Sequence, residues 1–180
     1  MIVAVLDADV LYPLPLRDTL LSAAAAGCFQ PRWSVFIVEE ATRNLVADGR
    51  LTAPKAKRLR ATLDLQFEDA FVEGHEPLIL TMPNHVKDRH VAACAVQGGA
   101  SLIVTSNLKD FAKLPPGVTA ISPDDFLCLL LEKTPQALAV ALTAQVARLK
   151  NPPMTLEVLL DRLAELTPSF VAAWKASSKI

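Results

Sequence analysis

The sequence lacks several features that mark common classes of protein. It has three cysteines, Cys28, Cys94 and Cys128, and their odd number and wide separation exclude a disulfide framework and the spacing of a zinc site. No apolar run approaches the roughly 18 residues of a membrane span. The first apolar run has no basic segment before it, so no secretory signal peptide is predicted. We therefore expect a protein of the reducing cytoplasm with no membrane partner.

The chain also lacks a large excess of positive or of negative charge. The formal net charge is -1, so bulk charge gives no indication of nucleic-acid binding. That argument is weak against a nuclease, because bound metal ions add positive charge where a phosphate must lie. The chain has 180 residues, of which 52% are hydrophobic and 21% charged. This composition excludes disorder and suffices for one domain with a buried core and an appendage.

Short apolar runs alternate with helical patterns along the first two thirds of the chain. Residues 2–6 are continuously apolar, as in a central parallel strand that is buried on both faces. Strands and helices that alternate predict a three-layer α/β/α fold around a central parallel sheet. The further strands are predicted at 29–33, 70–72, 102–105 and 118–121, and the helices at 18–27, from 34, at 53–67, at 87–97 and from about 122.

The character of the sequence changes at residue 134. Two Ala/Leu-rich helices are predicted at 136–150 and 155–166, and a further segment begins at Pro168. We expect an α/β domain over 1–133 and a helical C-terminal extension over 134–180. The apolar stripe of the first tail helix (Leu138, Leu142, Val146, Leu149) is most simply a surface that faces a core or a partner, and we favour the core.

Acidic and amide side chains stand where apolar runs stop or helices begin. Asp7 and Asp9 follow the first strand, and Asn107 follows a later one; Glu40 lies early in one predicted helix and Asp88 opens another. In open α/β sheets, ligands bind outside the carboxyl ends of the strands. Clustered carboxylates without a Cys or His ligand set favour a hard cation such as Mg²⁺ or Mn²⁺.

Such a cluster suits the hydrolysis of a phosphodiester. Two Mg²⁺ ions roughly 3.5 to 4 Å apart can neutralise the charge that builds on the phosphate and generate hydroxide near neutral pH, so no side-chain nucleophile is needed. Structural roles compete with this one. Asp9 could bond to its own turn, Asp88 could cap its helix, and Asn107 could be a turn residue. Helical periodicity alone does not choose between Glu39 and Glu40.

Four segments, in order along the chain, are similar to the PIN-domain ribonucleases, the class of the VapC-like toxins. The resemblance covers roughly residues 2–127 and implies a parallel sheet between helices and cleavage of RNA with Mg²⁺ or Mn²⁺, with 1–133 as the nuclease domain. The family's first three acids fall on Asp7, Glu40 and Asp88. The segments are Leu6-Asp7-Ala8-Asp9-Val10-Leu11-Tyr12, Trp33-Ser34 followed by Glu39-Glu40, Asp88-Arg89-His90-Val91-Ala92-Ala93, and Ile103-Val104-Thr105-Ser106-Asn107-Leu108-Lys109-Asp110-Phe111.

The fourth position, often Asp in the family, falls on Asn107, with Asp110 three residues on. An amide oxygen can still coordinate a cation, but the site loses one negative charge. Asp9 stands where many members have Asn, so it could restore part of that charge. Asp9 and Asp110 are therefore further candidate ligands.

The candidate substrate-binding residues are Ser106, Arg89, His90 and Lys109. The resemblance also implies an RNA substrate, an antitoxin protein as partner and a homodimer.

Two other functions stay open from the sequence. The Asp7-Ala8-Asp9 segment also resembles the nucleophile and acid pair of haloacid-dehalogenase-like phosphatases, although this leaves Glu40 and Asp88 without a role. The other alternative is a PIN-like domain that binds RNA or protein without cleaving it. The neutral Asn107 is the observation that suggests it.

Overall fold

The computed structural model describes residues 1–150 and 152–177. By its contacts the chain forms two compact units. The sheet unit comprises Ile2–Tyr12 and Gln30–Ile121, and the helical unit comprises Met1, Pro13–Phe29 and Ser122–Ile180. The domain boundary that we expect at residue 134 stays a prediction.

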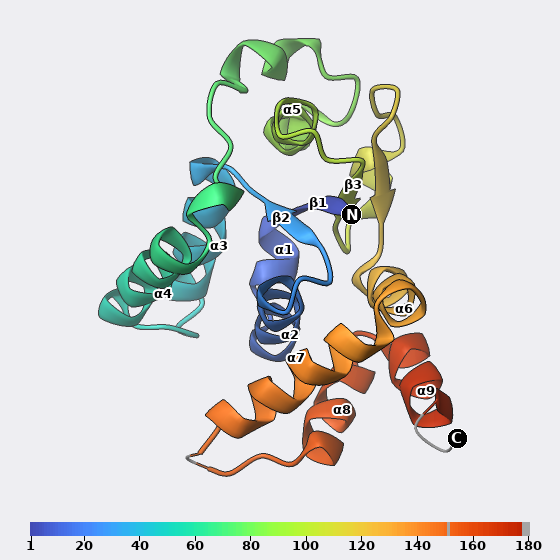
Figure 1. Ribbon diagram of the computed structural model, residues 1–180. Coiled ribbons are helices and arrows are strands. Elements are labelled where there is room, and N and C mark those ends of the chain that lie inside the picture. The colour runs from blue at the N-terminus through green and yellow to red at the C-terminus, as the bar shows by residue number, and fades with distance from the viewer. Residues whose placement is uncertain (151, 178–180) are drawn as a thin grey trace. The chain divides into compact units, whose positions relative to one another are not determined.

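The sheet unit holds a four-stranded parallel sheet in the order β2-β1-β3-β4 (Figure 1). Val5 of β1 pairs with Arg32 of β2 on one side and with Ile103 of β3 on the other. Ala4, Val5 and Leu6 have no exposed surface, as the continuous apolar run predicted. The strands are β1 Val3–Leu6, β2 Gln30–Arg32, β3 Leu102–Val104 and β4 Thr119–Ile121.

Helices flank both faces of this sheet, with α5 on the opposite side from α1 in Figure 1. Ser34 caps α3, because its side chain accepts a hydrogen bond from the backbone N–H of Ile37. Small residues let α5 lie close to β1 and β3; Ala92, Ala93 and Ala95 are fully buried. The helices of this unit are α1 Ala8–Leu11, α3 Val35–Ala47, α4 Ala53–Gln66 and α5 Arg89–Gln97, with 3₁₀ turns at Glu68–Ala70, Glu76–Thr81, Val86–Asp88 and Leu108–Phe111.

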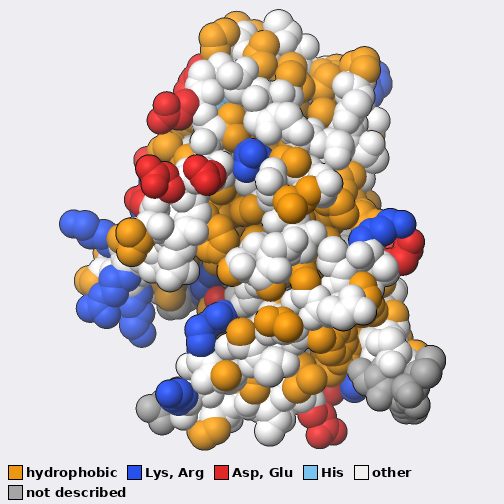
Figure 2. Space-filling model, viewed as in Figure 1, with side chains coloured by type: hydrophobic (Ala, Val, Ile, Leu, Met, Phe, Trp, Pro, Cys, Tyr) orange, Lys and Arg blue, Asp and Glu red, His pale blue; other side chains and the backbone are white. Residues whose placement is uncertain are grey.

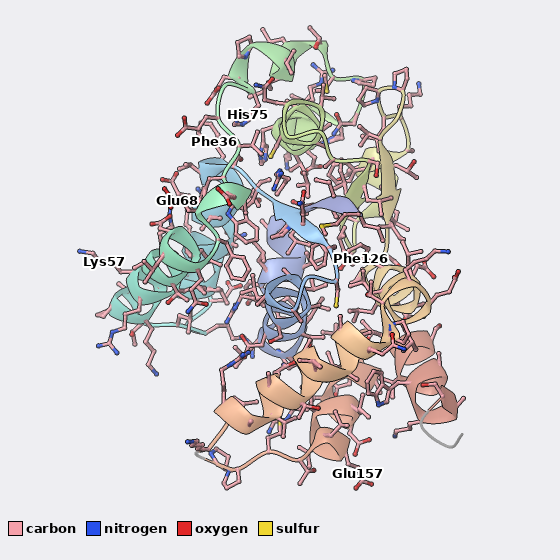
Figure 3. All side chains as sticks on the ribbon, viewed as in Figure 1. Phe36, Lys57, Glu68, His75, Phe126 and Glu157 are labelled. Atoms are coloured by element: carbon pink, nitrogen blue, oxygen red, sulfur yellow. The ribbon has the colours of Figure 1, made fainter. Side chains whose placement is uncertain are left out.

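The helical unit contains α2 Leu14–Ala25, α6 Pro123–Lys133, α7 Pro135–Arg148, α8 Leu156–Ala164 and α9 Pro168–Ser177. Leu138 and Leu142 of α7 are fully buried, so this part of the predicted stripe packs on a core, whereas Val146 and Leu149 are half-buried. The ring of Phe126, labelled in Figure 3, meets Phe29 edge to face at 5.0 Å between ring centroids. The predicted α/β/α class around a central parallel sheet, with additional C-terminal helices, is confirmed.

Two predicted boundaries and one predicted strand were wrong. Helix α2 begins at Leu14 and not at Asp18, because Pro15 fits the first turn of a helix, where an N–H has no intrahelical partner. No strand forms at 70–72: Phe71 makes an isolated parallel bridge with Trp33, just beyond the end of β2. Helix α5 begins at Arg89, and a 3₁₀ turn over Val86–Asp88 precedes it.

No single helix in the described residues is both long enough and apolar enough to cross a membrane. Helices α6 and α7 reach the required length and composition only as a pair, and the chain bends by 118° between them.

Candidate functional site

Two adjacent parallel strands bring the first and last segments of the site together. The backbone N–H of Asp7, just past β1, donates to the carbonyl of Val104, the last residue of β3, over 3.1 Å. The residues after β1 and those after β3 therefore leave the sheet at the same edge. Asp7 and Asp9 follow one strand at this edge, and Thr105, Ser106 and Asn107 follow the other.

Asp7 is the most deeply held of the acids, with 7% of its surface exposed. Its Oδ1 accepts a hydrogen bond from the backbone N–H of Ala8 at 2.8 Å, which starts α1. Its Oδ2 lies 2.9 Å from the buried hydroxyl of Thr105. Burial, and next the charge of Asp9, raise the pKa of the Asp7 carboxyl to about 7. The fold therefore holds this acid where its negative charge is poorly compensated.

Asp9 has one satisfied and one unsatisfied carboxylate oxygen. Its Oδ2 accepts a hydrogen bond from the backbone N–H of Ser106 at 2.8 Å, and the Thr105 hydroxyl lies 3.3 Å away. Its Oδ1 is buried and has no hydrogen-bond partner in the described chain. Burial raises the pKa of this carboxyl as well. A buried acceptor without a donor is uncommon in proteins and calls for a ligand or a specific explanation.

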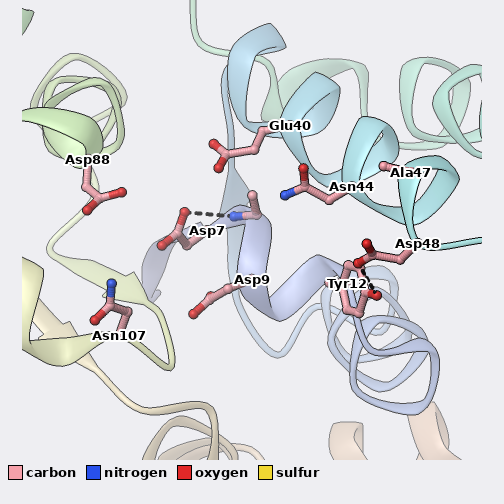
Figure 4. Close-up of a pocket in the computed structure, with 10 residues that line it drawn as sticks. Asp7, Asp9, Tyr12, Glu40, Asn44, Ala47, Asp48, Asp88 and Asn107 are labelled. Atoms are coloured by element: carbon pink, nitrogen blue, oxygen red, sulfur yellow. Dashed lines mark hydrogen bonds between the residues drawn. The ribbon is translucent and has the colours of Figure 1, made fainter. Parts of the chain in front are cut away.

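Asp7 and Asp9 open into a cavity of about 350 Å³ that Glu40, Asp88 and Asn107 also line (Figure 4). Five of the residues predicted for the site thus share one pocket, which the order of the strands brings about. We call it the acidic pocket. Its full lining is Asp7, Ala8, Asp9, Tyr12, Glu40, Asn44, Ala47, Asp48, Asp88 and Asn107.

Glu40 reaches the acidic pocket from α3. Its Oε2 lies 3.7 Å from Nε2 of His90 on α5. Burial lowers the pKa of His90, and Glu40 acts against that effect. The Phe36 ring packs edge to face against the rings of His75 and His90 in the same region. Figure 3 shows Phe36 near His75. His90 is thus a packed histidine beside a pocket acid.

Asp88 occupies the N-cap position of α5, but its side chain makes no capping hydrogen bond. Its carboxylate is therefore available to the pocket. Burial, and next the charge of Asp110, raise the pKa of Asp88. His85, Asp88 and Asp110 also offer three ligand atoms within 4.8 Å of one another. Asp88 accordingly belongs both to the acidic pocket and to this neighbouring cluster.

Asp110 does not line the acidic pocket, but it is tied to it through Asn107, whose amide nitrogen donates to Asp110 Oδ2. Lys109 and Asp110 line an adjacent cavity together with His85. Arg89 donates from Nε to the backbone carbonyl of Asn84. The roles predicted for these residues in binding metal or substrate stay predictions.

The donor set of the acidic pocket suits a hard cation. Its ligand atoms are carboxylate and amide oxygens, which Mg²⁺ and Mn²⁺ prefer. The unpartnered Asp9 Oδ1 and the raised pKa of Asp7 both show negative charge that the protein leaves unbalanced. A divalent cation would balance that charge.

Sequence reasoning missed several residues that shape the site. Thr105 is not among the predicted site residues, yet it is fully buried and its hydroxyl bonds to Asp7. Asn44 and Asp48 carried a usable signal, because they follow Glu40 at four and eight residues and so share its helix face. No pattern in the sequence indicates a role for His85, because it lies in an irregular Pro-containing loop.

The family model that describes the PIN domain matches residues 3–109 of this chain. The chain belongs to the PIN-domain family. A second model, described as the VapC50 C-terminal domain, matches residues 123–176, which take in α6, α7, α8 and most of α9. No solved structure matches the chain significantly.

A curated relative of this PIN-domain protein is "Putative ribonuclease VapC50" from Mycobacterium tuberculosis (strain ATCC 25618 / H37Rv). The two sequences are 43% identical over 106 residues, which are 57% of this chain and 63% of the relative. The matched region thus covers less than two thirds of either protein.

Proposed function

We propose that this protein is a metal-dependent endoribonuclease that hydrolyses RNA phosphodiester bonds with a metal-activated water, and that it acts as the toxin of a toxin-antitoxin pair. The unpartnered, buried Oδ1 of Asp9 beside the buried Asp7 carries the metal part of this proposal. The name of the curated relative supports the ribonuclease part. An antitoxin partner, a homodimer and a cytoplasmic location stay predictions.

The chain's own groups prepare the pocket. The Thr105 hydroxyl and the Ser106 N–H hold the carboxylates of Asp7 and Asp9 in place, and α3 and α5 supply Glu40 and Asp88 from elsewhere in the fold. A bound Mg²⁺ or Mn²⁺ would neutralise charge on the scissile phosphate and lower the pKa of the attacking water. Asp7, Glu40 and Asp88 would hold it, with Asp9, Asn107 and Asp110 as further candidates.

Basic side chains offer a place for the RNA backbone within the sheet unit. Lys and Arg side chains gather over α4 in Figure 2, and Figure 3 shows Lys57 pointing outward from that helix. The residues concerned are Lys55, Lys57, Arg58 and Arg60. Such contacts bind phosphates without distinguishing the base sequence. They would therefore hold the RNA backbone, while other residues choose the bond that is cut.

The geometry favours the nuclease over the phosphatase. Glu40 and Asp88 line the same pocket as Asp7, whereas a phosphatase that uses Asp7 and Asp9 needs neither. A non-catalytic RNA-binding or protein-binding domain has no observation in its favour beyond the neutral Asn107.

The test is cleavage of single-stranded RNA by the full chain in Mn²⁺ and, separately, in EDTA. We expect internal cuts in Mn²⁺, none in EDTA, and no adduct of beryllium fluoride on Asp7, which a phosphatase that forms an aspartyl phosphate would give. Binding without cleavage in Mn²⁺, together with no Mn²⁺-dependent thermal shift, would support the non-catalytic alternative instead.

A further inference from the structure

The acidic pocket extends beyond the acids that would hold a metal. One wall comes from α3, where Glu40, Asn44, Ala47 and Asp48 line the cavity at the spacing that places residues on one helix face. The facing wall comes from α1 and its end, through Asp9 and Tyr12. Figure 4 shows Asn44 between Glu40 and Asp48 along α3, with its amide directed toward α1. The cavity therefore has a second end, which Tyr12, Asn44, Ala47 and Asp48 form.

This second end differs in chemistry from the acid cluster. The Tyr12 hydroxyl donates to Asp48 Oδ2 at 2.7 Å, which fixes the ring, and Arg50 lies close enough to Tyr12 to offset part of the Asp48 charge. Asn44 makes no recorded side-chain hydrogen bond within the described residues, so its amide can serve a ligand. Ala47 is small and leaves the space between these groups open.

The charges indicate which part of an RNA fits at each end. A phosphate belongs at the acid cluster, where cations would offset its charge. At the other end a single carboxylate, that of Asp48, lines the cavity, which is too few to hold the cations that a second phosphate would need. The Asp48 carboxylate can instead accept hydrogen bonds from hydroxyls. The neutral occupant next to a phosphate in RNA is the ribose of the adjoining nucleotide. Its 2′-hydroxyl both donates and accepts, as does the Asn44 amide.

We propose that Tyr12, Asn44, Ala47 and Asp48 form a ribose subsite, in which the Asn44 amide hydrogen-bonds the 2′-hydroxyl of a nucleotide next to the scissile phosphate. The subsite lets the enzyme distinguish RNA from DNA. Asn44 is thus a specificity-determining residue, with Asp48 positioning Tyr12 beside it. This inference rests on the proposed ribonuclease activity.

The experiment pairs enzyme variants with substrate variants. The bond that the wild-type protein cuts in single-stranded RNA is mapped first, and short oligonucleotides carrying that bond are made with the 2′-hydroxyl replaced by hydrogen at one flanking nucleotide at a time. Wild type and Asn44→Ala are compared on each. We expect one deoxy position to lower kcat/KM of the wild type about tenfold, the value of one hydrogen bond, and to have little further effect on the variant.

A second variant tests the space itself. Ala47→Leu should fill the subsite and raise KM several-fold on the all-ribose oligonucleotide, while Ala61→Leu, an exposed alanine of α4, should not. Neither Asn44→Ala nor Ala47→Leu should change the thermal shift that Mn²⁺ produces. A loss of that shift would assign Asn44 to the metal instead and overturn the subsite.

The remaining outcomes separate the two proposals. If the wild type cuts no RNA, the ribonuclease proposal fails and the subsite fails with it. If the wild type cuts RNA but Asn44→Ala discriminates against the deoxy position as strongly as the wild type does, only the subsite is overturned. An Ala47→Leu variant with wild-type KM would likewise overturn the subsite alone.

Discussion

The two units of the molecule differ in whether their buried polar groups have hydrogen-bond partners. In the helical unit, the hydroxyl of Thr19 donates to Gln145 Oε1 at 3.0 Å, and both residues are almost fully buried. In the sheet unit, Asp7 is buried and Asp9 is half-buried, and the buried Oδ1 of Asp9 has no hydrogen-bond partner among the described residues. The first pair is satisfied within the chain and stabilises the fold. The second is incomplete, which is the signature of a binding site.

The largest expected effect is on cleavage. Asp7→Asn and Asp88→Asn should each reduce Mn²⁺-dependent RNA cleavage at least about 100-fold, because each removes a charged candidate ligand. Asn keeps an oxygen that can accept from the Ala8 N–H, so Asp7→Asn should still fold. The matched control is Asp69→Asn, an exposed acid outside the pocket, which should cleave at the wild-type rate. Full activity in either pocket variant would contradict the assignment of that residue to the catalytic site.

The next effect is on stability, and it depends on pH. The pKa of Asp7 rises from 3.8 to about 7 on folding, so the folded protein binds a proton that the unfolded chain releases between these values. Stability of the metal-free protein should therefore be greatest at low pH and fall as pH rises from about 4 to about 7, by at most about 4 kcal/mol.

Denaturant titrations across that range provide the measurement. Asp7→Asn lacks this titration, so it should be more stable than the metal-free wild type at pH 8 and similar near pH 4. Added Mn²⁺ should reverse the order at pH 8 by stabilising the wild type. A variant that is less stable than the metal-free wild type at pH 8 would show that the Asp7 charge is already compensated within the chain.

In the helical unit, Thr19→Val should cost about 1 to 3 kcal/mol of stability, because Gln145 Oε1 is then buried without a donor. Thermal denaturation gives the size of the loss. Thr143→Val removes an exposed hydroxyl of α7 and should change stability far less. Neither variant should alter the Mn²⁺-induced thermal shift. A change in that shift for Thr19→Val would mean that the two kinds of buried polar group are not independent.

The smallest expected effect concerns the position where the family often has an acid. Asn107→Asp should strengthen Mn²⁺ binding several-fold, since it adds a carboxylate to the acidic pocket. It should also lower the melting temperature without metal, because the new charge faces Asp110, to which the Asn107 amide now donates. Titration calorimetry with Mn²⁺ measures the affinity, and an unchanged value would remove residue 107 from the ligands.

The sequence carried much of this architecture. The apolar run at 2–6 and the alternation of strands and helices were sufficient to predict the parallel sheet, and Ser34 correctly marked the start of α3. The site residues could be selected because each follows a strand or opens a helix. The start of α2 was missed, because a proline that breaks a helix interior is well suited to its first turn.

Other features could not be predicted, because they depend on tertiary contacts. The pairing of β1 with β3 places Thr105 against Asp7, across 98 positions of sequence, and no local pattern signals that contact. The availability of Asp88 depends on a missing capping bond, which only the backbone geometry reveals.

The central claim is that the acidic pocket binds a divalent cation. The most direct measurement is an anomalous difference map from crystals of the full chain grown with Mn²⁺. We predict a peak within coordination distance of Asp7 and at least one of Glu40 and Asp88. A pocket without anomalous density, in crystals where Mn²⁺ is bound elsewhere on the protein, would contradict the account.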